Sequence, residues 1–177
     1  MIGVLVSGEG TNLQALVDAG LPVRAVASNR AGARALERAE RAGIAAGVFE
    51  LDDYGSRDVR DDAMAAWLSA HGVELVVCAG YMHLLTPVFL DRYPGRILNV
   101  HPSLLPDFPG ARAIDEALEA GVETTGVTVH LVDEGLDTGD VIRQEPLPVE
   151  PRETLTERIQ AIEHRLLPEV VRELCVR

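Results

Sequence analysis

The chain has 177 residues, of which 47% are hydrophobic, and its formal net charge at pH 7 is −12. This length and apolar content predict a single domain over residues 1–177 with a substantial core, and no apolar run approaches the roughly 20 residues that span a bilayer. The acidic balance argues against broad nucleic-acid binding, because phosphate backbones are held by clustered cations. The first residues do not resemble a signal or transit segment, so we expect a cytoplasmic protein.

The residue types narrow the chemistry further. All 16 basic residues are arginine, which excludes a Schiff-base lysine and a Walker-type phosphate lysine within this sequence. Cys78 and Cys175 lie in apolar surroundings with no C-x-x-C spacing, and no H-E-x-x-H occurs. We interpret them as reduced core thiols and expect no metal site.

Short apolar segments alternate with amphipathic helical patterns along the chain. Strands are expected at residues 2–6, 23–27, 46–50, 75–79, 97–100 and 128–132. Helices are expected at residues 12–18, 31–42, 56–71 and 113–120, and a long helix that Pro168 divides or kinks is expected within residues 149–174. Continuously apolar strands such as "ELVVCAG" indicate a sheet covered on both faces. The sequence therefore predicts an α/β fold with a doubly wound, mostly parallel sheet.

The first strand leads into the glycine-rich stretch "SGEGTNLQAL", at residues 7–16. Gly8 and Gly10 favour a tight turn, and the following helix directs free amide groups at whatever binds there, with Thr11 and Asn12 as further donors. A plain strand-to-helix turn with capping residues remains the alternative. Leu13 replaces the third glycine of G-x-G-x-x-G, and the second strand does not end in an acidic residue, so a monophosphate fits better than a dinucleotide.

A second candidate region is "RILNVHPSLLPDFPGARAI", at residues 96–114. Asn99 and His101 are two residues apart on a strand, so their side chains point to one face just where the strand ends. A third region, "VHLVDEGLDTGDVI", places His130 and Asp137 on either side of an acidic, glycine-rich turn. Taken alone that turn is typical of a solvated loop. Ligands in open α/β sheets bind at the carboxyl ends of strands, and there these regions are expected to converge.

The stretches "SGEGTNLQAL", "LNVHPSLLPDFPG", "GVTVHLVDEGLDTGDVI" and "IEHRLLP" resemble, in order and spacing, the glycinamide ribonucleotide transformylases, which are folate-dependent formyltransferases of purine biosynthesis. The resemblance covers nearly the whole chain. It implies a Rossmann-like formyltransferase fold and formyl transfer from 10-formyltetrahydrofolate to the amine of glycinamide ribonucleotide. Methionyl-tRNA formyltransferase is disfavoured, because its extra C-terminal domain and basic character have no counterpart in this sequence.

The resemblance also implies roles for three residues in a reaction that passes through a tetrahedral oxyanion. Asn99 is a neutral donor suited to the formyl oxygen, and a protonated His101 supplies a second donor. Asp137 is expected to hold that imidazolium and to relay a proton through water. The absence of a G-x-S-x-G elbow agrees with a reaction that needs no covalent nucleophile. A tight turn with a cis bond between Leu105 and Pro106 is also implied.

The ligand-binding residues that the resemblance implies fall into groups. For glycinamide ribonucleotide, the phosphate is expected at Gly10, Thr11 and Asn12, and the glycinamide and ribose end near Gln160 and Glu163. For the reduced folate, the expected pocket is Tyr81, Met82, His83, Leu84 and Leu85, with Arg57 at the glutamate tail. The protein is expected to be a monomer or a homodimer.

Three positions depart from the family pattern. Arg112 stands where many members carry histidine, Asp140 replaces the proline of a usual Gly-Pro, and His83 stands where arginine is common. Arg112 carries a permanent charge and cannot shuttle protons. Two other functions stay open: a formyltetrahydrofolate hydrolase, which sends water to the formyl group, and a non-catalytic nucleotide-binding module, which leaves the Asn99, His101 and Asp137 set without a purpose.

Overall fold

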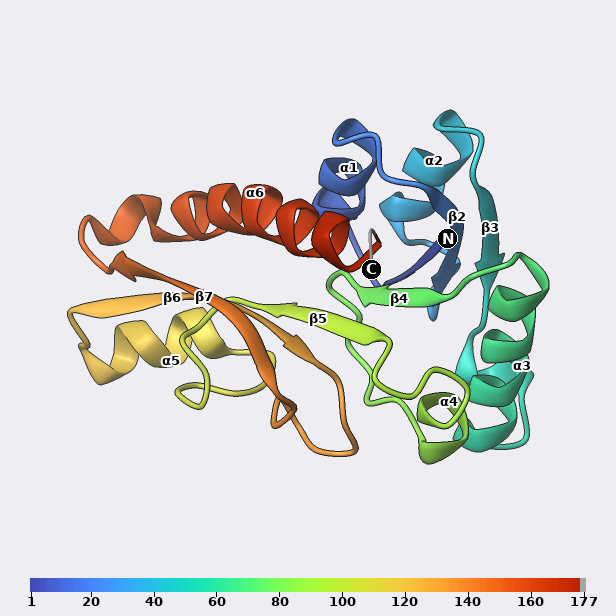
Figure 1. Ribbon diagram of the computed structural model, residues 1–177. Helices are drawn as coiled ribbons and strands as arrows, with labels where there is room; N and C mark the ends of the chain where they lie inside the picture. Colours follow the sequence, from blue (N-terminus) through green and yellow to red (C-terminus); the bar gives the residue numbers. More distant parts are fainter. Residues whose placement is uncertain (176–177) are drawn as a thin grey trace. The chain divides into compact units, whose positions relative to one another are not determined.

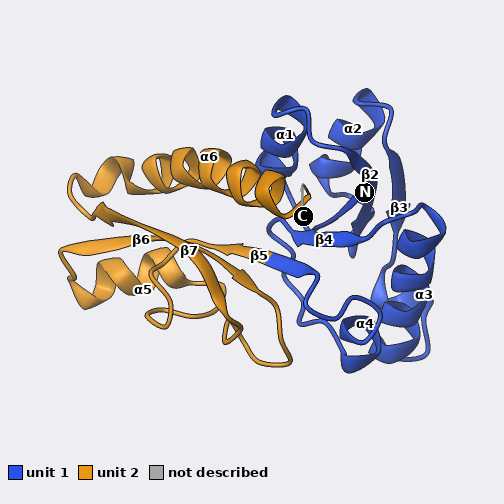
Figure 2. Cartoon of the chain, in the orientation of Figure 1, with its two compact units in different colours: residues 1–98 blue, residues 99–177 orange. Residues whose placement is uncertain are grey.

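The computed structural model describes residues 1–175, and its contacts divide the chain into two compact units, residues 1–98 and 99–177 (Figures 1 and 2). Strand β5 (Ile97–His101) begins in unit 1 and ends in unit 2. Each unit carries its own group of candidate functional residues.

Unit 1 alternates strands and helices. Its elements are β1 (Ile2–Val6), α1 (Thr11–Asp18), β2 (Val23–Ser28), α2 (Arg34–Arg41), β3 (Ala45–Val48), the 3-10 turn η1 (Leu51–Asp53), α3 (Arg57–Ala70), β4 (Leu75–Cys78) and α4 (Pro87–Leu90). The strands lie in the order β3-β2-β1-β4, and every pairing among them is parallel. All residues of β1 and β4 are buried, as expected for strands covered on both faces.

Unit 2 contains the remaining elements. They are the end of β5, α5 (Ala113–Ala120), β6 (Thr124–Leu131), β7 (Val141–Pro148), the 3-10 turn η2 (Arg152–Thr154) and α6 (Leu155–Cys175). Their strand order is β5-β6-β7, and β6 pairs with β7 in the antiparallel sense. Helix α6 packs on β6 and β7 (Figure 1). The expected α/β class with a mostly parallel sheet is confirmed.

Every expected strand and helix has a counterpart in the structure, but their ends often differ, and the short helix α4 was not expected. Strand β1 and helix α5 have the bounds that the pattern predicts, whereas α2 begins three residues later than expected and β6 begins four residues earlier. Strand β7 was not expected. Its prolines, Pro146 and Pro148, interrupt a strand pattern, and such residues are tolerated only at the edge of a sheet, where β7 lies.

Three further expectations need correction. Pro168 lies inside α6, which continues through it as one helix and buries the proline ring. Cys78 is buried as expected, but Cys175 is exposed and is no core residue. Gly8 does not adopt a left-handed backbone, while Gly10 does, with φ of 71°. Only the second of these two glycines is therefore required by the turn.

Candidate active site

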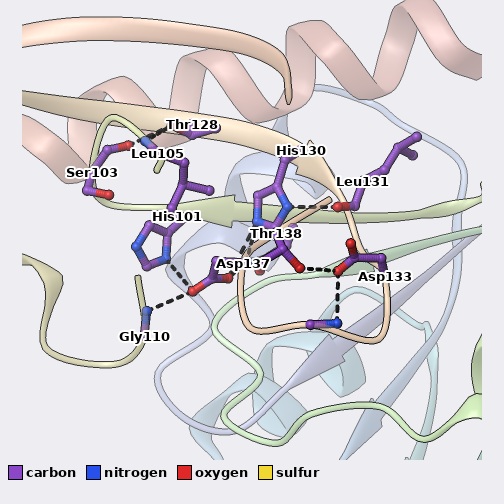
Figure 3. A network of polar contacts seen from close by, with 12 residues as sticks. His101, Ser103, Leu105, Gly110, Thr128, His130, Leu131, Asp133, Asp137 and Thr138 are labelled. Atoms are coloured by element: carbon purple, nitrogen blue, oxygen red, sulfur yellow. Dashed lines mark hydrogen bonds and ion pairs between the residues drawn. The ribbon is translucent and has the colours of Figure 1, made fainter. Parts of the chain in front are cut away.

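The end of β5 and the turn between β6 and β7 bring three of the predicted residues together in unit 2. Asn99 and His101 belong to β5. Asp137 lies in the turn, and its carboxylate faces the His101 ring (Figure 3). The Asn99 amide nitrogen lies 3.2 Å from Oδ1 of Asp137, and Nδ1 of His101 lies 3.4 Å from Oδ2 of the same carboxylate. The expected grouping of these side chains is present.

The Asn99 amide is shared between two acceptors. Besides Asp137, its nitrogen lies 3.1 Å from Nε2 of His130. Nδ1 of His130 lies 2.7 Å from the carbonyl oxygen of Leu131, so this nitrogen carries the hydrogen and donates it. Nε2 of His130 also lies 3.5 Å from Oδ1 of Asp137. It accepts from Asn99 when the ring is neutral, and it donates to Asp137 when the ring is protonated. With a neutral His130, both hydrogens of the Asn99 amide nitrogen are engaged, and one must be released before Asn99 donates to a substrate oxygen.

Both nitrogens of the His101 ring also face acceptors. Nε2 lies 2.8 Å from the carbonyl oxygen of Phe108, and a carbonyl oxygen only accepts, so Nε2 carries a hydrogen. Nδ1 faces the Asp137 carboxylate. Only the doubly protonated ring satisfies both neighbours, which is the imidazolium form that the reaction was expected to use. The ring is buried, so these contacts determine how it is oriented.

Asp137 is held as a carboxylate. Burial is the strongest influence on its pKa and acts to raise it. That effect is outweighed by the contact with His130, by the hydrogen bond of 2.8 Å from the Gly110 backbone N–H and by the charge of His101, so the pKa of Asp137 lies below its ordinary value. The group is therefore ionised at neutral pH and able to accept a proton or to balance an imidazolium.

Two non-glycine residues around this carboxylate have a left-handed backbone. Asp137 has φ of 55° and Phe108 has φ of 51°. Aspartate tolerates this region, whereas for a bulky residue such as phenylalanine it is unusual. The carbonyl of Phe108 is the one that accepts from His101, so the unusual backbone coincides with a contact of the candidate site.

A buried hydroxyl fixes the loop that follows β5 (Figure 3). Thr128 Oγ1 on β6 donates to the Ser103 carbonyl at 2.7 Å, and accepts from the Leu105 N–H at 3.1 Å and from Gln144 Nε2 at 2.9 Å. Gln144 also donates to the Leu105 carbonyl at 2.8 Å. The Leu105–Pro106 bond in this loop is cis, as the resemblance implied.

Sequence reasoning gave no role to His130, Thr128 or Gln144. The signal for His130 was visible, because it lies at the end of the strand that leads into the Asp137 turn. Thr128 is two residues before His130 on β6, so the two side chains share a face of the strand. Gln144 had no sequence signal, since strand β7 itself was not expected.

The other predicted residues of unit 2 lie on exposed or helical surfaces. On α6, Gln160 is exposed and Glu163 is buried. Arg112 is exposed and forms an ion pair of 2.7 Å with Glu119. Asp140 is exposed at the end of the turn that carries Asp137. The charge of Arg112, which immediately precedes α5, is thus balanced by a residue of that helix.

The expected phosphate loop lies in unit 1, at the start of α1. Gly10 precedes the helix and Thr11 and Asn12 begin it. A Cβ at Gly10 would lie 2.5 Å from the Cβ of Ala35, and the left-handed φ of Gly10 also disfavours a side chain. The close contact with Ala35 therefore requires glycine at position 10 whether or not a ligand binds there. A bulky substitution at Gly10 disturbs packing as well as any ligand.

The expected folate segment, Tyr81–Leu85, also lies in unit 1. Tyr81 and Leu85 are buried, while Met82 and Leu84 are exposed by 57% and 47%. Arg57, at the start of α3, donates to the Leu84 carbonyl and so contacts the segment itself. Met82 and Leu84 are therefore the apolar side chains of this segment that are open to solvent.

Within residues 1–175, no helix is both long and apolar enough to cross a membrane. In the same part of the chain, no group of three or more His, Cys, Asp or Glu side chains is placed to hold a metal ion.

An α/β fold with an amide, an imidazole and an ionised carboxylate joined at a strand end defines an enzyme of acid–base group transfer. The chain matches the Formyl transferase family over residues 1–171. It belongs to this family.

Known members of the family are similar over most of the chain. The phosphoribosylglycinamide formyltransferase of Mycobacterium tuberculosis (strain ATCC 25618 / H37Rv) is 47% identical over 178 residues, which are 97% of this chain and 83% of that protein. A crystal structure of glycinamide ribonucleotide transformylase 1 from Symbiobacterium toebii has a TM-score of 0.94 and 49% identity, covering 97% of this chain and 85% of that one.

Longer relatives match as well. The trifunctional purine biosynthetic protein adenosine-3 of Chironomus tentans is 44% identical over 182 residues. The match covers 97% of this chain but only 13% of that relative.

Proposed function

We propose that the protein transfers a formyl group from 10-formyltetrahydrofolate to the amine of glycinamide ribonucleotide, a step of purine biosynthesis. The observation that carries this proposal is the joined set of Asn99, His101 and Asp137, with both ring nitrogens of His101 facing acceptors. The family relationship supports it, since the bacterial relative of similar length is a phosphoribosylglycinamide formyltransferase. We also propose that residues 1–177 form one formyltransferase domain.

The chemistry asks for charge stabilisation and for proton transfer. The substrate amine attacks the formyl carbon, and the carbonyl electrons move onto oxygen to give a tetrahedral oxyanion. Asn99 and the His101 imidazolium stabilise this oxyanion, each by turning a hydrogen from its present acceptor to the substrate oxygen. The attacking nitrogen loses a proton, the folate nitrogen gains one, and the carbon–nitrogen bond to folate breaks. Asp137, ionised at neutral pH, accepts the proton of the amine through water and returns it through water to the folate nitrogen.

Binding roles complete the proposal. Gly10, Thr11 and Asn12 hold the phosphate through backbone N–H groups and the positive end of the α1 dipole. Gln160 and Glu163 meet the ribose and glycinamide end. The segment Tyr81–Leu85, with Arg57, takes the folate: its exposed apolar side chains pack on the ring, and its backbone groups meet the polar ring edge.

The decisive experiment follows loss of 10-formyltetrahydrofolate in the presence and absence of glycinamide ribonucleotide. Turnover that requires the ribonucleotide, with a formylated product detected by mass spectrometry, is the expected result. Turnover to formate without ribonucleotide would identify a hydrolase instead. No turnover under either condition, from protein shown to be folded, would leave only a binding role and overturn the proposal.

A further inference from the structure

A fully buried ion pair lies in unit 1, outside the candidate catalytic group. Arg60 and Asp61 are consecutive residues of α3, and neither side chain is exposed to solvent. Arg60 Nε donates to Oδ1 of Asp61 at 2.7 Å. Charged side chains are seldom fully buried, and a buried pair adds little net stability compared with apolar residues of similar size. A contribution to stability therefore does not by itself explain why this pair is buried.

The pair contacts the expected folate segment, Tyr81–Leu85, and the residue that follows it. Arg60 NH1 lies 2.9 Å from Nδ1 of His83, and Oδ2 of Asp61 accepts from the Thr86 backbone N–H at 2.8 Å. With the bond from Arg57 to the Leu84 carbonyl, three side chains from the first turns of α3 hold the stretch that begins at His83. The segment is thus fixed at His83, at the residue that follows it and at Thr86.

The contact with Arg60 determines which nitrogen of His83 carries hydrogen. A guanidinium has donors and no acceptor, so Nδ1 of His83 must be the acceptor and the hydrogen of the neutral ring lies on Nε2. Within residues 1–175, no protein group accepts from this Nε2. His71, in the same unit, has the opposite arrangement, because its Nδ1 lies 2.8 Å from the Trp67 carbonyl and donates to it.

The charges around His83 keep its ring neutral. Burial is the main cause that lowers the pKa of His83, followed by the positive charges of Arg60, Arg57 and Arg30, while Asp61 acts in the opposite direction. A neutral ring with one hydrogen offers a single directional donor. The same positive surroundings favour an electron-rich acceptor opposite it.

We propose that Arg60, paired with Asp61, is a positioning residue that fixes His83 in the form with hydrogen on Nε2, and that this Nε2–H donates to an oxygen acceptor of the reduced folate. The inference rests on the proposed function for the identity of the ligand. The arrangement of hydrogen on the ring does not depend on it. His83 thereby serves as a specificity residue through its side chain, besides contributing backbone groups to the segment.

The first test needs no substrate. In protein labelled with 15N at histidine, long-range 1H–15N correlation spectra near pH 8 report which ring nitrogen carries hydrogen. His83 is expected to carry it on Nε2 and His71 on Nδ1, with Arg60→Met changing the pattern of His83 alone. A His83 ring with hydrogen on Nδ1, or doubly protonated at this pH, overturns the proposal.

The second test separates the two ends of the ring. His83→Asn keeps an acceptor near the Nδ1 position for Arg60 but has no atom at the Nε2 position, whereas His83→Gln reaches that position with a donor. The KM for 10-formyltetrahydrofolate is expected to rise about 2- to 10-fold in His83→Asn, the range for one lost hydrogen bond, with kcat little changed. His83→Gln keeps a donor near the Nε2 position but offers Arg60 no acceptor near Nδ1, so its KM is expected to rise less than that of His83→Asn.

Matched controls make these outcomes decisive. His71→Asn should leave KM unchanged, because His71 bonds only within its own helix. Equal KM values for the Asn and Gln variants of His83, or a fall in kcat without a change in KM, would overturn the donor role. If wild-type protein fails to transfer formyl groups, the proposed function fails, but the spectra still decide the state of His83. Arg60→Met leaves Asp61 buried without its partner, so the His83 variants carry the test if that variant does not fold.

Discussion

Nδ1 of His101 lies 3.4 Å from a carboxylate oxygen of Asp137, while Nε2 of the same ring lies 2.8 Å from the carbonyl oxygen of Phe108. The second contact requires hydrogen on Nε2, and the first is attractive only when Nδ1 is protonated too. The negatively charged Asp137 carboxylate therefore orients the ring at Nδ1, while the Phe108 carbonyl orients it at Nε2. Removal of that charge, with the shape of the side chain kept, isolates its contribution.

Asp137→Asn is expected to lower kcat by about 10²- to 10⁴-fold, the range for loss of a positioned acid or base. Asparagine has nearly the same shape and tolerates the left-handed backbone at this position, so the turn is expected to remain. His101→Ala should give a similar loss, and the double variant should be little worse than either single one, because the pair acts as a unit. Steady-state kinetics with both substrates measure these effects.

Asp140→Asn is the matched control for this charge. Asp140 is exposed in the same turn, so its amide variant should retain wild-type kcat. Losses that multiply fully in the double variant of His101 and Asp137 would contradict the coupling between them. A wild-type rate for Asp137→Asn would remove the carboxylate from the mechanism.

The lowered pKa of Asp137 predicts how stability depends on pH. A carboxyl group with a depressed pKa in the folded state contributes stability that is fully present above its unfolded-state value, here the ordinary 3.8, and is lost as pH falls through the lower folded-state value. The free energy of unfolding of wild type minus that of Asp137→Asn should therefore shrink as pH falls below 3.8. Urea titrations across this range measure the difference, and a difference that grows on acidification would contradict the assignment.

The turn that carries Asp137 depends on Gly139. A Cβ at this residue would lie 1.9 Å from the Leu131 carbonyl oxygen, which belongs to the backbone and cannot move aside as a flexible side chain does. Gly139→Ala is expected to lower the free energy of unfolding by about 1–3 kcal/mol, the usual cost of overpacking. It should also lower kcat, because the turn must shift. Thermal denaturation and kinetics test both effects.

Gly55→Ala controls for the added methyl group. A Cβ at Gly55 has no heavy atom within 4 Å, and its backbone is not left-handed, so little change is expected. Equal destabilisation by the two alanines would show that the close approach at Gly139 is not what matters.

Much of the fold could be predicted from the sequence because apolar strands buried on both faces leave a strong pattern. Strand β7 could not, since it lies at the sheet edge, has no buried residue and contains Pro146 and Pro148. The ends of the elements were also imprecise. Helix ends depend on capping geometry and neighbouring chain, which a pattern of apolar residues does not specify.

The candidate site was predictable only in part. The spacing of Asn99 and His101 on one strand indicated a shared face, and the resemblance supplied Asp137. The partners that constrain them could not be predicted, because the carbonyl of Phe108 and the amide of Gly110 reach the site through loop geometry. Backbone groups carry no residue-type signal in a sequence.

The hydroxyl of Thr128 holds the loop after β5, and its removal tests whether that loop positions the candidate site. It is fully buried and bonds the Ser103 carbonyl, the Leu105 N–H and the Gln144 amide. Thr128→Val keeps the volume but removes the hydroxyl, leaving buried polar groups without a partner, at a cost of about 1–3 kcal/mol in the free energy of unfolding. Thr128→Ser keeps the hydroxyl and loses only a methyl group.

The same pair of variants should differ in activity. The loop that Thr128 holds continues to the Phe108 carbonyl, which accepts from His101, and to the Gly110 N–H, which donates to Asp137. Loosening of the loop displaces both contacts, and small displacements of catalytic groups cost up to about 100-fold in rate. Thr128→Val is therefore expected to lower kcat on the order of 10-fold or more at temperatures where it remains folded. Thr128→Ser should stay near wild type, and equal kcat values for the two variants would show that the hydroxyl does not position His101 and Asp137.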